Sequence, residues 1–154
     1  MTITINNMFF TNFTPTYVTN NLSFNVDAGN PASYPGSGTT WTDLGPSALS
    51  GSFYNSPTYS SSTGGYISFS GSNNVQWPYN SSAFNFGTGD FTCEVWYNKQ
   101  SVPSYPRLLA LGAYGTGGNF EIECHNNYAL YLHINGSYQS YGATLNTNSW
   151  YQVV

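Results

Sequence analysis

The chain is short of charged side chains, and above all of basic ones. Charged residues make up 5% of its 154 residues, against about a quarter in ordinary soluble domains. Its basic side chains are Lys99 and Arg107, and its formal net charge is −4. Nucleic acids and anionic membranes are bound by clustered Lys and Arg. We therefore predict no nucleic-acid partner, and a surface that uncharged polar side chains solvate.

Long hydrophobic runs are also missing. No apolar run of the sequence approaches the about 20 residues that a membrane-spanning helix needs, so we predict no membrane insertion. The stretch Met1–Asn7 has no basic segment followed by an apolar block, the pattern of a secretory signal. If the protein acts outside a cell, we expect it to travel there as part of a larger particle.

Cysteine is scarce. Cys93 and Cys124 both lie in stretches that alternate like strands, with apolar neighbours two positions away. Because cysteine is among the most buried residue types, we predict two buried free thiols. A disulfide between them stays open at this point. Metal binding would need more Cys or His at short spacing, which neither residue has.

The sequence lacks a helical period and instead alternates apolar and polar residues over short stretches separated by Gly, Pro, Asn and Ser. This pattern predicts a single all-β, antiparallel β-sandwich over residues 21–154, preceded by an extended N-terminal segment over residues 1–20. The expected strands are 22–27, 51–55, 66–70, 73–77, 91–97, 107–111, 119–124, 128–134, 138–141 and 150–154.

Two stretches carry the strongest local signals. Phe91–Tyr97 has bulky side chains on both faces of an alternating strand, which favours an inner strand at the centre of the sandwich. Asn135-Gly136 is the preferred pair for a two-residue hairpin turn, because both residues tolerate positive φ. We therefore expect Tyr138–Tyr141 to pair back on Tyr128–Ile134.

Three stretches, Val26–Pro31, Tyr34–Leu44 and Phe86–Trp96, resemble the concanavalin A-like lectin/glucanase superfamily in its laminin-G-like branch. The resemblance extends over Leu22–Val154 and implies a jelly-roll sandwich. The amino-acid sequence of Asp27–Leu44 is similar to that in copies of this domain found in structural proteins of phages. The resemblance thus implies a virion protein, made in the host cytoplasm.

The sequence departs from this family in two places. Members often have an acidic residue where Ser70 and Asn74 stand here. The acidic residues Asp27, Asp43 and Asp90 are each isolated, whereas a calcium site needs several converging oxygens. We therefore predict no bound metal, and the sequence supports calcium binding only weakly. Members also continue with further strands beyond the position of Val154. The resemblance therefore implies either a longer chain or a protomer whose open sheet edge is completed by neighbours.

Glu121 and Glu123 are the carboxylates closest to a catalytic pair. Retaining glucanases of the superfamily carry a longer motif, Glu-x-Asp-x-Glu or Glu-x-Asp-x-x-Glu, with carboxyl groups about 5–5.5 Å apart. Side chains two apart on a strand lie about 6.5–7 Å apart. We predict no catalytic residues, and keep glycan hydrolysis as a distant alternative.

Carbohydrate binding has better candidates. If Cys124 pairs with Tyr128, then Glu121 faces Tyr131 and His133 lies diagonal to Glu121, on one polar face. A solvated sheet face or a subunit interface is the favoured alternative for it. Trp41, Trp96 and Trp150 are expected in the core or anchoring loops. Two aromatic residues beside a turn, Trp77 and Tyr79, are further candidates. The candidate sugar-binding residues are therefore Trp77, Tyr79, Glu121, Glu123, Tyr131 and His133.

The composition and the resemblance together predict a virion structural protein: a tail, fibre or capsid-decorating component. Its partners would be other virion proteins or copies of itself, contacted through Tyr, Asn and Ser. A module that binds host-surface glycans is the alternative function.

Overall fold

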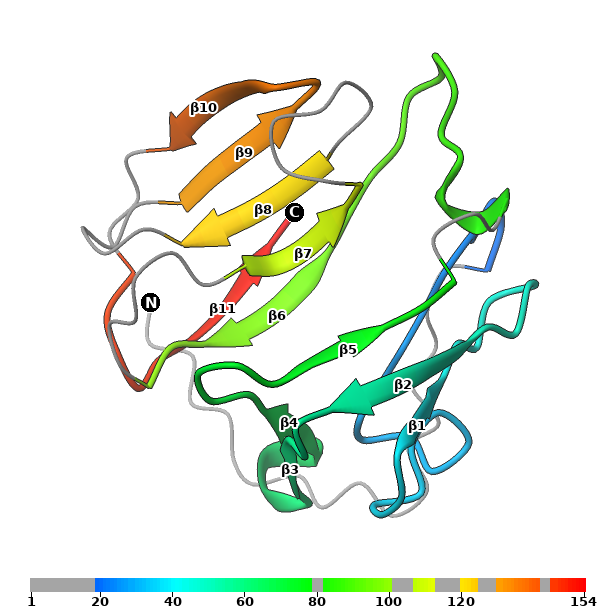
Figure 1. Cartoon of the computed structure of the whole chain (residues 1–154), viewed down its shortest axis with the longest axis vertical. Helices are drawn as coiled ribbons and strands as arrows, with labels where there is room; N and C mark the ends of the chain where they lie inside the picture. Colours follow the sequence, from blue (N-terminus) through cyan, green and yellow to red (C-terminus); the bar gives the residue numbers. More distant parts are fainter. Residues whose placement is uncertain (1–18, 79–81, 101–106, 113–119, 125–129, 142–144) are drawn as a thin grey trace, which may run out of the picture.

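The computed structural model describes residues 19–78, 82–100, 107–112, 120–124, 130–141 and 145–154 (Figure 1). Within these ranges the regular elements are strands and two short 3₁₀ turns, Ser62–Gly64 and Ser82–Phe84, and every strand pair is antiparallel. The all-β prediction is therefore confirmed. Among the residues placed, no helix is long and apolar enough to cross a membrane.

The strands form four sheets, with the orders β10-β9-β8-β7, β11-β6, β1-β2-β5 and β3-β4 (Figure 1). Their bounds are β1 Thr40–Thr42, β2 Ser50–Tyr54, β3 Thr58–Ser60, β4 Tyr66–Ser68, β5 Asn74–Gln76, β6 Val95–Asn98, β7 Arg107–Leu111, β8 Phe120–Cys124, β9 Leu130–Ile134, β10 Ser137–Tyr141 and β11 Trp150–Val153. Most predicted strands are present; β1 and β3 were not predicted.

The hairpin of β9 and β10 forms as the sequence predicts. Ser137 pairs with Ile134 across a two-residue turn, in which Asn135 has φ 52° and Gly136 has φ 79°. Positive φ at both positions matches the twist of the strands that follow, which is why Asn-Gly is favoured there. The turn thereby adds β10 as an edge strand of the four-stranded sheet.

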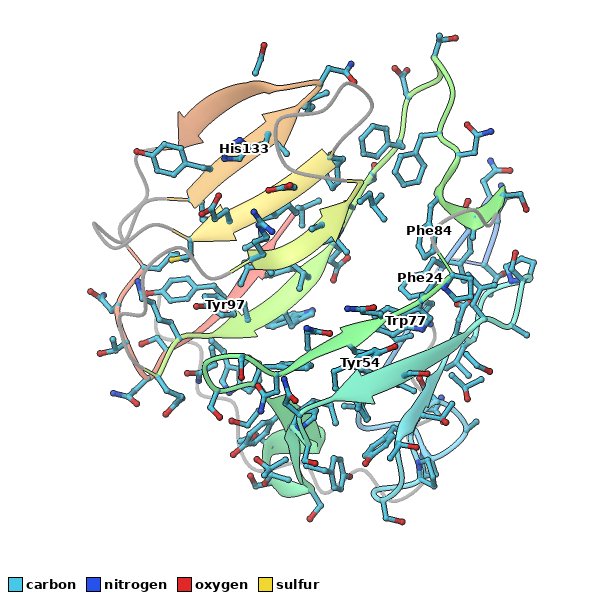
Figure 2. The ribbon with its side chains drawn as sticks, viewed as in Figure 1. Phe24, Tyr54, Trp77, Phe84, Tyr97 and His133 are labelled. Atoms are coloured by element: carbon cyan, nitrogen blue, oxygen red, sulfur yellow. The ribbon has the colours of Figure 1, made fainter. Side chains whose placement is uncertain are left out.

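An aromatic cluster packs beneath β2 and β5. The ring of Trp77 lies edge-on to Phe24 at 5.1 Å and tilted against Trp41 at 5.8 Å, and Phe84 packs on Phe24 (Figure 2). A Cβ at Gly51 would lie 2.4 Å from Trp77 Cε2, so β2 needs a glycine where this indole crosses it.

The segment 22–27, predicted as the first strand, is not a strand. Its backbone is held by the buried carboxylate of Asp43, whose Oδ1 accepts the N–H groups of Asn25 and Gly45, both at 2.7 Å. The Leu44 N–H donates back to the Asn25 carbonyl. A side-chain carboxylate thus takes the place of a partner strand. Residues 1–18 of the predicted N-terminal segment lie outside the described ranges.

The strand β6 is shorter and less enclosed than predicted. It begins at Val95 rather than Phe91, and in the described part of the chain its hydrogen-bonded neighbour is β11 alone. One face of β6 is directed toward β8. Lys99 follows the last residue of β6, and its Nζ lies 3.4 Å from Cys124 Sγ of β8. The other face of β6 carries Trp96, which is 62% exposed. The predicted inner strand is therefore covered on one face.

Candidate functional site

The strand β8 carries the two candidate carboxylates, and all five of its residues are buried. Glu121 has 0% and Glu123 5% relative exposure. Phe120, Ile122 and Cys124 alternate with them and occupy the opposite face. The interpretation of the glutamate face as solvated is therefore wrong for this chain: both faces of β8 are covered.

The neighbouring strand β9 supplies His133 and Tyr131 to the glutamate face. Glu121 lies opposite His133 and Glu123 opposite Tyr131, because Cys124 pairs with Leu130 and not with Tyr128 as expected. The predicted residues do share a face, but in a register shifted by two. His133 Nε2 lies 3.3 Å from Glu123 Oε2, so the close contact is the diagonal one.

The strand β7 supplies a cation to the same face. Arg107 Nε lies 3.3 Å from Glu121 Oε2. Among the described residues, no donor meets hydrogen-bond geometry with either Glu121 oxygen, so this ion pair compensates the charge of a fully buried carboxylate. We call Arg107, Glu121, Glu123 and His133 the acidic cluster. Arg107 offsets the charge of Glu121, and Glu121 presents no surface that a substrate could touch.

The opposite face of β8 holds a second polar contact, at Cys124. The Cys124 side chain is fully buried, and Lys99, 1% exposed, directs Nζ at its sulfur. Burial, followed by the charge of Cys124 and a hydrogen bond to it, raises the pKa of Tyr97 to about 12. Both cysteines are free thiols as predicted, but Cys124 is buried whereas Cys93 is only partly buried, because the chain around it is less enclosed than predicted. Burial, and then the charge of Glu94, raises the pKa of Cys93.

The aromatic sugar-binding candidates are not brought to the acidic cluster. Trp77 is half-buried, and its Nε1–H donates to the Trp41 carbonyl at 3.2 Å. Figure 2 shows Trp77 with Phe24 and Phe84, in a different part of the molecule from His133. Tyr79 lies outside the described residues. The predicted set therefore does not form a single site.

The structure instead exposes two tryptophans that were expected in the core or anchoring loops. Trp96 is 62% exposed and Trp150 is 41% exposed. The register pairs Trp96 with Gln152 and Trp150 with Asn98, so all four lie on one face of the two-stranded sheet. Glu94 joins them, because its Oε1 accepts Trp96 Nε1–H at 3.1 Å and Gln152 Nε2–H at 2.8 Å. We call these five residues the outer face.

A signal for the outer face is present in the sequence. Glu94, Trp96 and Asn98 alternate along one strand, and Trp150 and Gln152 along another. Polar residues that flank a tryptophan at two-residue spacing indicate a face that meets water. The bulk of Trp96 by itself favours a covered position, and its polar neighbours favour an exposed one.

Two of the isolated aspartates, Asp27 and Asp43, have structural roles. Asp27 Oδ1 accepts the N–H of Gly29 at 2.8 Å, and Asp43 caps the backbone of Asn25 and Gly45. Within the placed ranges, no group of three or more His, Cys, Asp or Glu is arranged to hold a metal ion.

Comparison of the chain with models of protein families, with curated proteins and with solved structures gave no match.

Proposed function

We propose that this chain is a virion structural protein, a tail, fibre or capsid-decorating component, that works by protein–protein assembly. The proposal includes a jelly-roll sandwich of the concanavalin A-like kind and a location in the extracellular particle. The observation that carries it is the outer face: two exposed tryptophans beside amide side chains, in a chain with 5% charged residues. Aromatic residues are enriched at interface centres and most charged residues are depleted there. The outer face has one charged residue, Glu94, beside its two tryptophans.

The acidic cluster supports the proposal because its glutamates are not arranged as the catalytic pair of a glycoside hydrolase. A glycoside hydrolase needs a carboxylic acid and a carboxylate on either side of a bound sugar. Glu121 and Glu123 are buried side by side and are engaged by Arg107 and His133. The proposal assigns them to stability and assigns no catalytic residue.

Carbohydrate binding is the second candidate function. The exposed indoles favour the outer face as its binding site, rather than the sugar-binding residues that the sequence predicts. Aromatic rings have an apolar face on which a sugar ring can stack. Binding of the purified chain on a glycan array, lost on Trp96→Ala, would support this candidate. A chain that binds no glycan would leave assembly as the function.

Mass spectrometry of purified particles that carry the gene tests the first candidate. The chain should be present at a fixed ratio to the other structural proteins and should persist through density-gradient purification. A chain that is found in infected cells and is absent from purified particles would overturn the virion assignment.

A further inference from the structure

We propose that the outer face binds an arginine side chain of a different protein, with the guanidinium stacked on tryptophan and paired with Glu94. This inference rests on the proposed assembly function and adds the chemistry of the partner. It follows from the geometry of the outer face, from the hydrogen bonds and exposure of Glu94, and from the positions of the chain's own basic side chains.

The two tryptophans form a platform. Trp96 lies opposite Gln152, and Trp150 lies opposite Asn98, so the tryptophans are diagonal neighbours on one side of the sheet. Diagonal residues of an antiparallel pair are about 7–8 Å apart. A planar group on this face can therefore contact one indole while its stem lies along the other.

The platform is held in place before any partner arrives. The Trp96 indole N–H is fixed on Glu94 Oε1 at 3.1 Å. The Trp150 ring packs edge-on against Tyr66 of β4, with ring centroids 5.8 Å apart. Side chains that are already ordered lose less rotamer freedom on binding, so an exposed aromatic surface of this kind favours association.

Glu94 makes the face selective for a cation. Its Oε1 takes both donors, from Trp96 and from Gln152, and no described residue donates to Oε2. An exposed carboxylate with an open oxygen beside an indole matches guanidinium, which is planar, stacks on aromatic faces and donates several N–H groups. An ammonium has the charge but not the plane, so arginine fits better than lysine.

The arginine has to come from another protein. The basic side chains of this chain are Lys99 and Arg107. Lys99 is 1% exposed and its Nζ is directed at Cys124. Arg107 Nε is paired with the buried Glu121. A second copy of the chain could offer a cation only by disturbing one of these contacts, and its net charge of −4 repels an identical copy and attracts a basic partner.

The test uses the isotope-labelled full chain and follows its indole N–H resonances by NMR, with a short arginine-containing peptide as the probe. Tryptophan-to-phenylalanine variants assign the resonances. Trp96 and Trp150 should shift and saturate with the peptide, while Trp41 and Trp77, packed in the aromatic cluster, should not. A peptide with neutral citrulline in place of arginine should cause little shift, and lysine should bind more weakly.

The variant Glu94→Gln removes the charge and keeps an acceptor for Trp96, so the platform stays ordered. Binding of the arginine peptide should weaken about fivefold, the upper range for an exposed ion pair, and wild-type binding should weaken with salt. Unchanged Trp41 and Trp77 resonances verify the fold of the variant.

Three results would overturn the inference: no shift with arginine, an equal shift with citrulline, or shifts of Trp96 and Trp150 by oligosaccharides in the absence of any arginine effect. The last would assign the face to glycans. These outcomes are separate from the particle measurement, because a chain found in virions without arginine binding keeps the proposed function and loses the proposed partner chemistry.

Discussion

Arg107 Nε lies 3.3 Å from Glu121 Oε2, and this contact joins a half-exposed cation to a carboxylate with no exposed surface. A carboxylate that leaves water loses its hydration, which costs several kcal/mol unless an opposite charge compensates. Because the guanidinium reaches in from β7, it also ties the edge of the four-stranded sheet to β8. The acidic cluster is thus a stabilising element of the fold.

Removal of this cation should destabilise the protein. Arg107→Ala is expected to lower the free energy of unfolding by about 3 kcal/mol, the low end for a broken buried ion pair, because Arg107 is half exposed. The double variant with Glu121→Gln should recover part of that loss, since residue 121 then carries no buried charge that lacks a partner. Urea unfolding measures both. Ser52→Ala, at an exposed position of β2, is the control, and an Arg107→Ala variant as stable as this control would contradict the stabilising role.

The raised pKa of Tyr97 predicts a stability change at alkaline pH. Below pH 10 the phenol is protonated in both states; between 10 and about 12 the unfolded chain loses this proton while the folded chain keeps it. Stability should therefore fall as pH rises through this window, relative to Tyr97→Phe, which has no proton to lose. The near-ultraviolet absorbance of phenolate is measured against pH for the wild type and for Tyr97→Phe. The difference between the two curves should have its midpoint near pH 12. A difference curve centred at 10 would contradict the burial of Tyr97 against Cys124.

The two thiols should differ in reactivity. Cys124 is fully buried, and should be alkylated only after unfolding. Cys93 is partly accessible, but burial and Glu94 raise its pKa, so at neutral pH its reactive thiolate is scarce and its labelling slow. Glu94→Gln removes the nearby charge and should speed labelling of Cys93. Mass spectrometry of the alkylated peptides resolves the sites. Equal labelling of both cysteines in the native protein would be inconsistent with the fold.

The close passage of Trp77 over Gly51 gives a test of the aromatic cluster. Gly51→Ala would place a methyl group 2.4 Å from Trp77 Cε2. Overpacking of this kind typically costs 1–3 kcal/mol, so we expect about 2 kcal/mol of destabilisation. The tryptophan signal in near-ultraviolet circular dichroism should change as well. A fully stable Gly51→Ala variant would place the indole elsewhere.

Local chemistry made part of this fold predictable. The hairpin at Asn135-Gly136 depends on two residues that tolerate positive φ, which can be read from the residues themselves. The segment 22–27 alternates like a strand, yet its backbone bonds to Asp43, a partner distant in sequence. Strand alternation therefore predicts an extended chain but not what the chain pairs with.

The site was harder to predict than the fold, because alternation shows which residues share a face and not which face is covered. Glu121, Glu123, Tyr131 and His133 were correctly grouped, but their register depends on the connection between β8 and β9. The glutamates are buried and Trp96 is exposed, against the usual preferences of these residue types. Both reversals arise from tertiary packing, which short-range pattern does not contain.

Hydroxyl-radical footprinting of the isolated chain and of the chain in purified particles tests most directly whether the outer face is the contact surface. Trp96 and Trp150 should be oxidised readily in the isolated chain and strongly protected in the particle. His133, 6% exposed, should be oxidised slowly in both and serves as the internal control. Equal oxidation of both tryptophans in the free and assembled protein would contradict the account.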